Sequence, residues 1–221
     1  MHVFENRTEA GQLLARELED RLRRAASTDL VVLGLPRGGV PVAFEVAAAL
    51  DAPLDVLVVR KLGVPAEPEL AMGAIGEHDA MVLDDGIVER LRVSESEVRR
   101  VETAEREVLE RRVAQLRAVR PPEPLAGRTA IVVDDGVATG STARLACRMA
   151  RELGAARVVL AVPVAPADTL DTFTDADEVV CLASPHFFLA VGRYYRDFSA
   201  TKDDDVVRLL EAAVGGRGQQ P

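Results

Sequence analysis

Two adjacent carboxylates followed by a run of small and hydroxyl-bearing residues form the strongest chemical signal in this sequence. An apolar stretch ends at Asp134 and Asp135, and the chain continues through Gly136, Val137, Ala138, Thr139, Gly140, Ser141 and Thr142. Small residues let the backbone approach an anion closely, and the N–H groups that begin a helix attract phosphate. The hydroxyls add hydrogen-bond donors, and the carboxylates can accept hydrogen bonds from sugar hydroxyls. The segment therefore predicts a site for a phosphorylated sugar.

Two other segments carry charges or amides that suit phosphate oxygens. After Pro36, the glycines Gly38 and Gly39 expose backbone amides, and Arg37 supplies a fixed positive charge. Arg60 and Lys61 stand together at the end of an apolar run. A glycine-rich turn and a solvated strand end would explain the same residues without a ligand. Their interpretation therefore depends on where the fold places them.

A second Asp-Asp-Gly, at Asp84, Asp85 and Gly86, lacks the hydroxyl-rich continuation. We expect a turn there, with an aspartate capping a helix. The sequence contains neither the G-x-x-x-x-G-K-[ST] pattern of P-loop ATPases nor the G-x-G-x-x-G pattern of dinucleotide-binding domains. Both of those phosphate-binding classes are disfavoured.

The chemical segments lie between alternating strand and helix patterns. Apolar runs typical of buried parallel strands occupy 29–34, 54–61, 129–135, 157–164 and 178–183, and helices are predicted over 7–26, 40–50, 94–117, 166–173, 203–213 and from the hydroxyl-rich loop to Leu153. A hairpin is predicted within 62–86. This alternation indicates an α/β fold with a parallel central sheet flanked by helices. Ligands in such folds bind beyond the carboxyl ends of the strands, which singles out 34–40, 60–70 and 134–142.

Composition narrows the classes of partner. The chain has 221 residues, 48 % of them hydrophobic and 29 % charged, which suits one globular domain. Its net charge of −9 disfavours nucleic acid and anionic membranes as partners, because both need a basic face. Cys147 and Cys181 match no metal or redox spacing. Without a signal-peptide pattern or an apolar stretch long enough to span a bilayer, we expect a cytoplasmic protein.

The apolar run, the acidic pair and the Thr139–Thr142 loop resemble the signature of the type I phosphoribosyltransferases. The order of the elements extends this resemblance over about residues 29–200, and RKLG followed by ELAMGA and a late AVGRYY resembles a group of these enzymes with no assigned acceptor. The resemblance implies the type I phosphoribosyltransferase fold, which is Rossmann-like. It also implies Mg²⁺-dependent transfer of a phosphoribosyl group from 5-phosphoribosyl 1-diphosphate to a base or amine, with release of pyrophosphate.

The resemblance further implies roles for individual residues. The loop from Ala138 to Thr142 would hold the ribose 5-phosphate, while Asp134 and Asp135 would hold the ribose hydroxyls and Mg²⁺, directly or through water. The loop around Arg37 would bind pyrophosphate together with Arg60 and Lys61. In this family that loop often contains a cis peptide bond that does not precede proline.

The same resemblance organises the rest of the chain. A single domain would span 1–214, with a flexible loop and an inserted long helix in 62–125, a hood in 184–200 and a disordered tail in 215–221. Aromatic residues of the hood could stack on a planar acceptor; the candidates are Phe187, Phe188, Tyr194 and Tyr195. A homodimer is expected.

Ala138 bears on the choice of acceptor. Family members that act on 6-oxopurines carry aspartate there, whereas those acting on adenine or uracil carry alanine, so a 6-oxopurine is disfavoured. A general base would have to come from elsewhere, with Glu67, Glu69 and His78 as candidates. Two other functions stay open: a non-catalytic module that senses 5-phosphoribosyl 1-diphosphate, and a phosphohydrolase that uses the same pocket.

Overall fold

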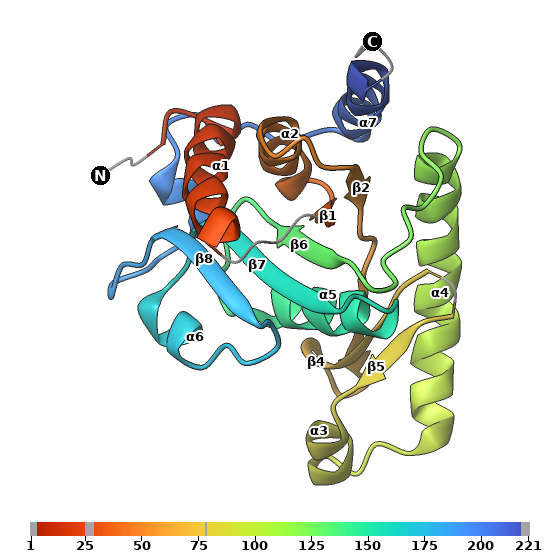
Figure 1. Ribbon diagram of the computed structural model, residues 1–221. Coiled ribbons are helices and arrows are strands. Elements are labelled where there is room, and N and C mark those ends of the chain that lie inside the picture. The colour runs from red at the N-terminus through yellow and green to blue at the C-terminus, as the bar shows by residue number, and fades with distance from the viewer. Residues whose placement is uncertain (1–3, 25–28, 78, 218–221) are drawn as a thin grey trace.

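The computed structural model describes residues 4–24, 29–77 and 79–217 (Figure 1). Its helices are α1 (Arg7–Arg24), α2 (Gly39–Ala49), α3 (Asp85–Arg90), α4 (Glu95–Arg117), α5 (Ser141–Glu152), α6 (Ala167–Asp171), the 3-10 helix η1 (Val191–Tyr194) and α7 (Asp203–Arg217). Its strands are β1 (Leu30–Gly34), β2 (Leu54–Val56), β3 (Arg60–Val64), β4 (Glu67–Ile75), β5 (Met81–Leu83), β6 (Thr129–Val133), β7 (Arg157–Val164) and β8 (Glu178–Ala183). His78 lies outside the described residues. None of the described helices combines the length and apolar character needed to cross a membrane.

Five parallel strands form the central sheet, in the order β2-β1-β6-β7-β8. The chain forms β1 first, and β2 then pairs with one side of β1. It returns to the other side of β1 with β6 and continues outward through β7 and β8. The predicted parallel α/β architecture is thereby confirmed.

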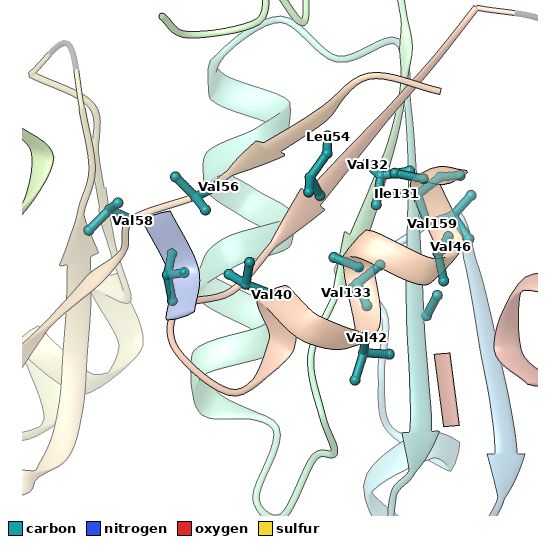
Figure 2. Close-up of a cluster of buried hydrophobic side chains, with 14 of the residues drawn as sticks. Val32, Val40, Val42, Val46, Leu54, Val56, Val58, Ile131, Val133 and Val159 are labelled. Carbon is teal, nitrogen blue, oxygen red and sulfur yellow. The ribbon is translucent and has the colours of Figure 1, made fainter. Parts of the chain in front are cut away.

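Four of the five strands, β1, β2, β6 and β7, are buried on both faces, which explains their apolar runs, whereas only Val180 is buried in the edge strand β8. Val32, Ile131 and Val159 belong to one apolar cluster, together with residues of α1 and α2 (Figure 2). Their neighbours along the strands belong to a second cluster that includes residues of α5. Because successive side chains of a strand point to opposite faces, the runs feed both clusters. Figure 1 shows α1 and α2 on one face of the sheet and α5 on the other.

The apolar run 54–61, predicted as one strand, divides between two sheets. β2 ends at Val56, opposite Gly34, where its neighbour β1 also ends. The chain makes one more hydrogen bond, from the Leu57 N–H to the Gly34 carbonyl at 3.1 Å. It then starts β3 at Arg60, which pairs with Ile75. The predicted position of Arg60 and Lys61, at the end of a parallel strand, was wrong because β1 offers no further partner there.

The segment after this crossing forms a second sheet, in which β3, β4 and β5 are antiparallel. The predicted hairpin is confirmed, and the part of the chain predicted to contain a flexible loop is built from these strands. Asp84 caps α3, since its carboxylate accepts a hydrogen bond from the Ile87 N–H at 3.1 Å. The second Asp-Asp-Gly is therefore the predicted helix cap.

The long helix α4 follows the second sheet and packs on it. Ser94 and Glu97 form a reciprocal capping box at its start. Val98, Leu109 and Leu116 are its buried residues and join the same apolar cluster as β3 and β4. This stripe lies on one side of a helix that is otherwise strongly charged.

A buried cluster of charges fastens the end of α4 to the central sheet. The Arg117 guanidinium donates to Asp55 in β2 at 2.6 Å and to both carboxylate oxygens of Glu77 at 2.6 Å. It also reaches the Val56 carbonyl at 3.2 Å. The second Asp55 oxygen accepts the Glu123 N–H at 2.9 Å. One arginine thus ties the edge strand, the loop after β4 and the segment after α4 together.

The C-terminal part of the chain returns to the N-terminus and to α2. Phe4 forms an isolated parallel bridge with Tyr195, which brings residues 184–200 beside the start of the chain. Val206 and Leu210 of α7 are buried in the cluster that contains α2. α7 continues to Arg217, so it includes residues 215–217 of the predicted tail. Residues 218–221 lie outside the described part of the chain.

Replacing Arg117 with alanine is expected to lower the free energy of unfolding by about 3–5 kcal/mol, because it leaves two buried carboxylates without their partner. Urea denaturation at neutral pH would measure the loss. Arg99→Ala in the same helix is the control, since the Arg99–Glu95 pair is 67 % and 89 % exposed, and we expect a change below about 1 kcal/mol. Equal losses in the two variants would contradict an anchoring role for Arg117.

Candidate functional site

The site lies where the strand order of the central sheet changes direction. β1 and β6 are neighbours, but the chain proceeds from β1 toward one edge and from β6 toward the other. Parallel α/β sheets bind ligands at such a switch point, beyond the carboxyl ends of the strands. The Leu35 N–H donates to the Val133 carbonyl at 2.9 Å, so the loop after β1 begins against the end of β6. Two of the three predicted segments, 34–40 and 134–142, are thereby brought together.

Gly38 and Gly39 allow these two loops to touch. A Cβ at Gly38 would overlap the Asp135 carboxylate, and a Cβ at Gly39 would lie 2.5 Å from the Val133 carbonyl oxygen. Side chains at either position would push the loops apart. The Pro36–Arg37 peptide bond is cis, which the family resemblance had implied. The glycines therefore permit a close approach of the first loop to the acidic pair.

Hydrogen bonds from neighbouring segments hold the backbone of the hydroxyl-rich loop in place. The Val137 N–H donates to the Val164 carbonyl at 2.9 Å, and the Thr169 hydroxyl donates to the Ala138 carbonyl at 3.0 Å. Gly140 has a φ of 81°, a left-handed conformation that favours glycine.

Most of the loop's other side chains face solvent. Ala138, Thr139, Ser141 and Thr142 are exposed, and the Thr139 and Ser141 hydroxyl oxygens lie 3.2 Å apart. Val137 is the exception, because its side chain is buried in the core, and a Cβ at Gly136 would lie 2.5 Å from Val191. The exposed hydroxyls are therefore available to a ligand.

The two helices that begin at the switch point start without a side-chain cap. The N-cap residue of α2 is Gly38 and that of α5 is Gly140. Neither glycine has a side chain that could cap its helix. Neither helix has an acidic residue in its first turn. By contrast, α3 and α4 are capped by Asp84 and Ser94. The first N–H groups of α5 therefore remain available to an anion. Those of α2 do not, because Gly39 donates to the Leu35 carbonyl at 3.0 Å, Val40 donates to the Arg37 carbonyl at 3.3 Å, and the third residue is a proline.

Arg7, which the sequence did not single out, holds one of the two carboxylates. Its guanidinium contacts Asp135 Oδ2 through two nitrogens, at 2.7 and 2.8 Å, and the side chains are only 12 % and 14 % exposed. Arg7 also donates to the Ser199 carbonyl at 2.8 Å and lies 4.0 Å from the centre of the Phe198 ring. No local pattern marks Arg7, because its partners are far away in the sequence.

Tyr195 completes this support. Its hydroxyl donates to the Asp135 carbonyl at 2.6 Å, and its ring is 1 % exposed. Tyr195 was predicted as a stacking residue for an acceptor, but its burial excludes that role and makes it part of the core. Burial raises the pKa of Tyr195, and Asp135 adds to the shift, so the hydroxyl keeps the proton that it donates.

Electrostatics distinguishes the two carboxylates. Burial, with repulsion from Asp135, raises the pKa of Asp134 well above its ordinary value. Burial also raises the pKa of Asp135, but the Arg7 guanidinium opposes that shift. Two carboxylates side by side cannot both ionise without a cost. Without a ligand, Asp134 therefore lacks the cationic partner that Asp135 has.

Arg37, Phe187 and Tyr194 were also predicted to contact a substrate. Arg37 is half exposed and lies 3.8 Å from Asp203 at the start of α7. Phe187 is 79 % exposed in the 184–200 segment. Tyr194 stacks on Phe188, with ring centres 5.4 Å apart, and its hydroxyl donates to the Phe187 carbonyl at 3.2 Å. These residues leave an exposed aromatic side chain at the edge of the fold.

Arg60 and Lys61 line a separate cavity of about 620 Å³. Thr142, the last residue of the hydroxyl-rich loop, contributes to its wall. The Arg60 guanidinium donates to Glu105 of α4, with a Nε–Oε2 distance of 2.9 Å. Arg60 thus already has a carboxylate partner on the long helix. The sequence, which predicted that Arg60 binds pyrophosphate, did not indicate this partner.

A magnesium ion would find few protein ligands here. Among the described residues no group of three or more His, Cys, Asp or Glu side chains lies close enough to hold a metal. Asp134 and Asp135 supply carboxylates, and Arg7 already pairs with Asp135. Mg²⁺ is often held by one or two carboxylates together with substrate phosphates and water. The residues fit an ion that arrives with a phosphorylated substrate.

An open helix N-terminus beside an acidic pair, at the switch point of a parallel sheet, is the arrangement expected of a phosphate-binding α/β domain. The chain belongs to the phosphoribosyl transferase domain family, whose sequence pattern matches residues 5–197. Both the predicted family and the predicted fold are confirmed.

Three known proteins show how close this relationship is. Mycobacterium tuberculosis proteins of strains H37Rv and CDC 1551, named "Putative phosphoribosyl transferase Rv0571c" and "Putative phosphoribosyl transferase MT0597", are each 53 % identical to this chain over 214 residues, 96 % of it. The chain spans 47 % of their length, about half. The crystal structure of TT1426 from Thermus thermophilus is 42 % identical and superposes with a TM-score of 0.86, covering 96 % of this chain and 99 % of that one.

Asp134→Asn is expected to stabilise the metal-free, unliganded protein by about 1 kcal/mol at pH 8, the gain usual when a strained functional residue is replaced. Since the folded-state pKa of Asp134 is raised, the stability linked to it is present below the unfolded pKa of about 3.9 and is lost as pH rises through the folded pKa. The advantage of asparagine should therefore vanish near pH 4. Thermal unfolding in EDTA across this range would measure it, and an advantage that grows toward low pH would contradict the assignment.

Arg7→Ala is expected to lower the free energy of unfolding by about 3 kcal/mol, because it leaves the Asp135 carboxylate enclosed and unpaired. Adding Asp135→Asn should recover part of this loss, since the unpaired charge disappears. The two single variants and the double variant form a cycle that denaturation measures. Arg196→Ala is the matched control, because the Arg196–Glu5 pair is 71 % and 61 % exposed. Additive effects of the two substitutions would contradict the pairing.

Proposed function

We propose that this protein binds 5-phosphoribosyl 1-diphosphate at the switch point and transfers its phosphoribosyl group to a base or amine, releasing pyrophosphate. The observation that carries the proposal is the open N-terminus of α5 beside Asp134 and Asp135, with the loop that contains Arg37 and Gly38 against the same carboxylates. A ligand with a phosphate at each end and hydroxyls between them complements this arrangement. Family membership supports the same ligand.

Each part of the site then has a task. The N–H groups that begin α5 and the hydroxyls of Thr139 and Ser141 bind the 5-phosphate. Asp134 and Asp135 accept hydrogen bonds from the ribose hydroxyls and orient the ring. The Gly38 N–H and the Arg37 guanidinium bind pyrophosphate and stabilise the charge that it gains as its bond to the anomeric carbon breaks. Donors placed at developing charge are typically worth about 10²–10³-fold in rate each.

Mg²⁺ is the proposed cofactor, held by Asp134 directly or through water together with the substrate. We favour Asp134 over Asp135 for direct contact, because Arg7 already occupies Asp135. When bound, Mg²⁺ supplies positive charge that offsets the charge of the phosphates. Arg60 and Lys61 line a cavity that Thr142 also borders. They contact pyrophosphate only if the ligand extends into that cavity.

The acceptor would lie under the segment 184–200. Phe187 and the stacked Tyr194 are the aromatic surfaces left for a planar base, because Tyr195 is buried. The exposed Ala138 leaves no carboxylate at its position, which continues to disfavour a 6-oxopurine. A cytoplasmic homodimer remains part of the proposal.

Calorimetric titration with 5-phosphoribosyl 1-diphosphate, with and without Mg²⁺, tests the site. We expect Mg²⁺-assisted binding by the wild type and a loss of about 10²-fold or more in Asp134→Asn/Asp135→Asn, since charged hydrogen bonds contribute about 1.5–3 kcal/mol each. Asp84→Asn/Asp85→Asn is the matched control, because it makes the same change in the other Asp-Asp-Gly and asparagine still caps a helix. No binding by the wild type, or equal weakening in the control, would refute the proposal.

Product analysis with purine, pyrimidine and amine acceptors then separates the candidate functions. Release of pyrophosphate that depends on an acceptor identifies the transferase. Free phosphate without an acceptor identifies a phosphohydrolase, and binding without turnover identifies a sensing module.

A further inference from the structure

The long helix α4 lies along one edge of the molecule and exposes a regular stripe of residues on its outer side (Figure 1). Val98 and Leu116 are buried, and the residues two positions further along, Arg100 and Ala118, are exposed about half a turn away. Exposed residues recur between these two at spacings of four and three positions, the spacing of the contact seam in a two-helix coiled coil. They form the outer stripe, which consists of Arg100, Ala104, Glu107, Arg111, Ala114 and Ala118. The outer stripe is therefore placed to contact another helix.

The two charges at the middle of the outer stripe have no ionic partner in the described part of the chain. Elsewhere in α4, Glu102 pairs with Arg106, four positions on, at 2.8 Å. Glu107 and Arg111 have the same order and spacing, yet no ion pair or side-chain hydrogen bond joins either one to a described residue. Both charges therefore remain available to another molecule.

These charges become complementary when a second copy of the helix runs antiparallel to the first. A two-fold axis at the level of Leu109 places position 107 of each copy opposite position 111 of the other. Glu107 of each copy then meets Arg111 of the other, which gives two identical ion pairs. Self-complementary contacts of this kind are typical of symmetric dimers. A parallel arrangement in register would instead oppose glutamate to glutamate and arginine to arginine.

The other positions of the outer stripe fit the same arrangement. Ala104 of one copy lies opposite Ala114 of the other, and Arg100 lies opposite Ala118. Because the distance between packed helices depends on the side chains at the contact, the facing alanines allow a close approach. No position of the outer stripe then sets two large or two like-charged side chains against each other.

Charge along the whole of α4 favours the same orientation. Residues 95–105 contain four glutamates and two arginines, whereas residues 106–117 contain four arginines and two glutamates. An antiparallel neighbour places the acidic half of one helix beside the basic half of the other, and complementary charge of this kind selects the orientation of a contact. A parallel neighbour would bring like halves together.

We propose that α4 is a self-association surface, on which two copies of this chain pack their outer stripes in an antiparallel, two-fold symmetric contact. Glu107 of each copy binds Arg111 of the other at the centre of this contact. The outer stripe includes neither the acidic pair nor any residue of the hydroxyl-rich loop, so the inference does not depend on the proposed function. It assigns the expected homodimer to a surface of the inserted helix.

Sedimentation velocity of the full chain, without ligand, tests the contact by charge reversal. Because a contact between single helices is a small interface, we expect wild-type dimers at a chain concentration of about 100 µM. Glu107→Arg and Arg111→Glu should each weaken dimerisation at least about 10-fold, since every dimer then contains two like-charge contacts in place of two ion pairs. The variant with both substitutions should dimerise again, because it restores both pairs with the charges exchanged.

Mixing and a matched control sharpen this test. A 1:1 mixture of the two single variants should form dimers, because one copy then presents two arginines and the other two glutamates. Arg99→Glu makes the same charge change on the same helix outside the outer stripe, at a side chain that is 67 % exposed, and should leave dimerisation unchanged. A monomeric wild type, a dimer that both single reversals leave intact, or a double variant that stays monomeric would overturn the inference.

Disulfide cross-linking checks the orientation. Ala104→Cys mixed with Ala114→Cys should cross-link under mild oxidation, because the two positions face each other. Ala104→Cys alone should not, since its two copies lie ten positions apart, about 15 Å along the helix, and a disulfide spans at most about 7 Å between Cα atoms. The wild type, with Cys147 buried and Cys181 half-buried, gives the background. Efficient cross-linking of Ala104→Cys with itself would refute the antiparallel contact.

Discussion

The parallel pairing of β1 with β6 is the constraint on which the rest of the structure depends. Its register sets Gly34 opposite Val133, so the two strands end together and the loops that follow must share one space. Contact between those loops is possible only because Gly38 and Gly39 have no side chains. Two helices then begin beside the same pair of carboxylates, and the free N–H groups of α5 make the switch point attractive to phosphate. Removing this adjacency would leave a glycine-rich turn and an acidic turn with no common ligand.

The features that suit a ligand also destabilise the chain without one. Asp134 and Asp135 repel each other, and α2 and α5 forgo the side-chain caps that α3 and α4 have. The buried strands of the central sheet, packed on both faces, supply the stability that offsets these costs. Arg7 and Tyr195 hold Asp135 from outside the sheet, which keeps the acidic pair in place. Enzymes commonly combine a destabilised functional site with a well-packed core that supplies the stability.

The inserted elements change what the domain can contact. The second sheet and α4 share one apolar cluster with the central sheet, and Arg117 joins them to β2 through buried carboxylates. This attachment makes the insertion part of the domain. It also creates a cavity whose lining includes cationic residues of β3 and α4 together with Thr142 of α5. The same helix therefore holds the insertion in place through Arg117 and lines this cavity through Arg100.

The sequence by itself determined the fold class, the family and the hydroxyl-rich loop, because these depend on local patterns: apolar runs, helical periodicity and an acidic pair before T-G-S-T. It also separated the two Asp-Asp-Gly segments correctly, since a helix cap needs no distant partner. Only the tertiary structure decided that 54–61 divides between two sheets, because a strand ends where its neighbour ends. The tertiary structure likewise decided that Arg7 lies beside Asp135, that Tyr195 is buried, and that Arg60 pairs with Glu105. These contacts join residues 45 or more positions apart, and no local pattern of residue types encodes such a distance.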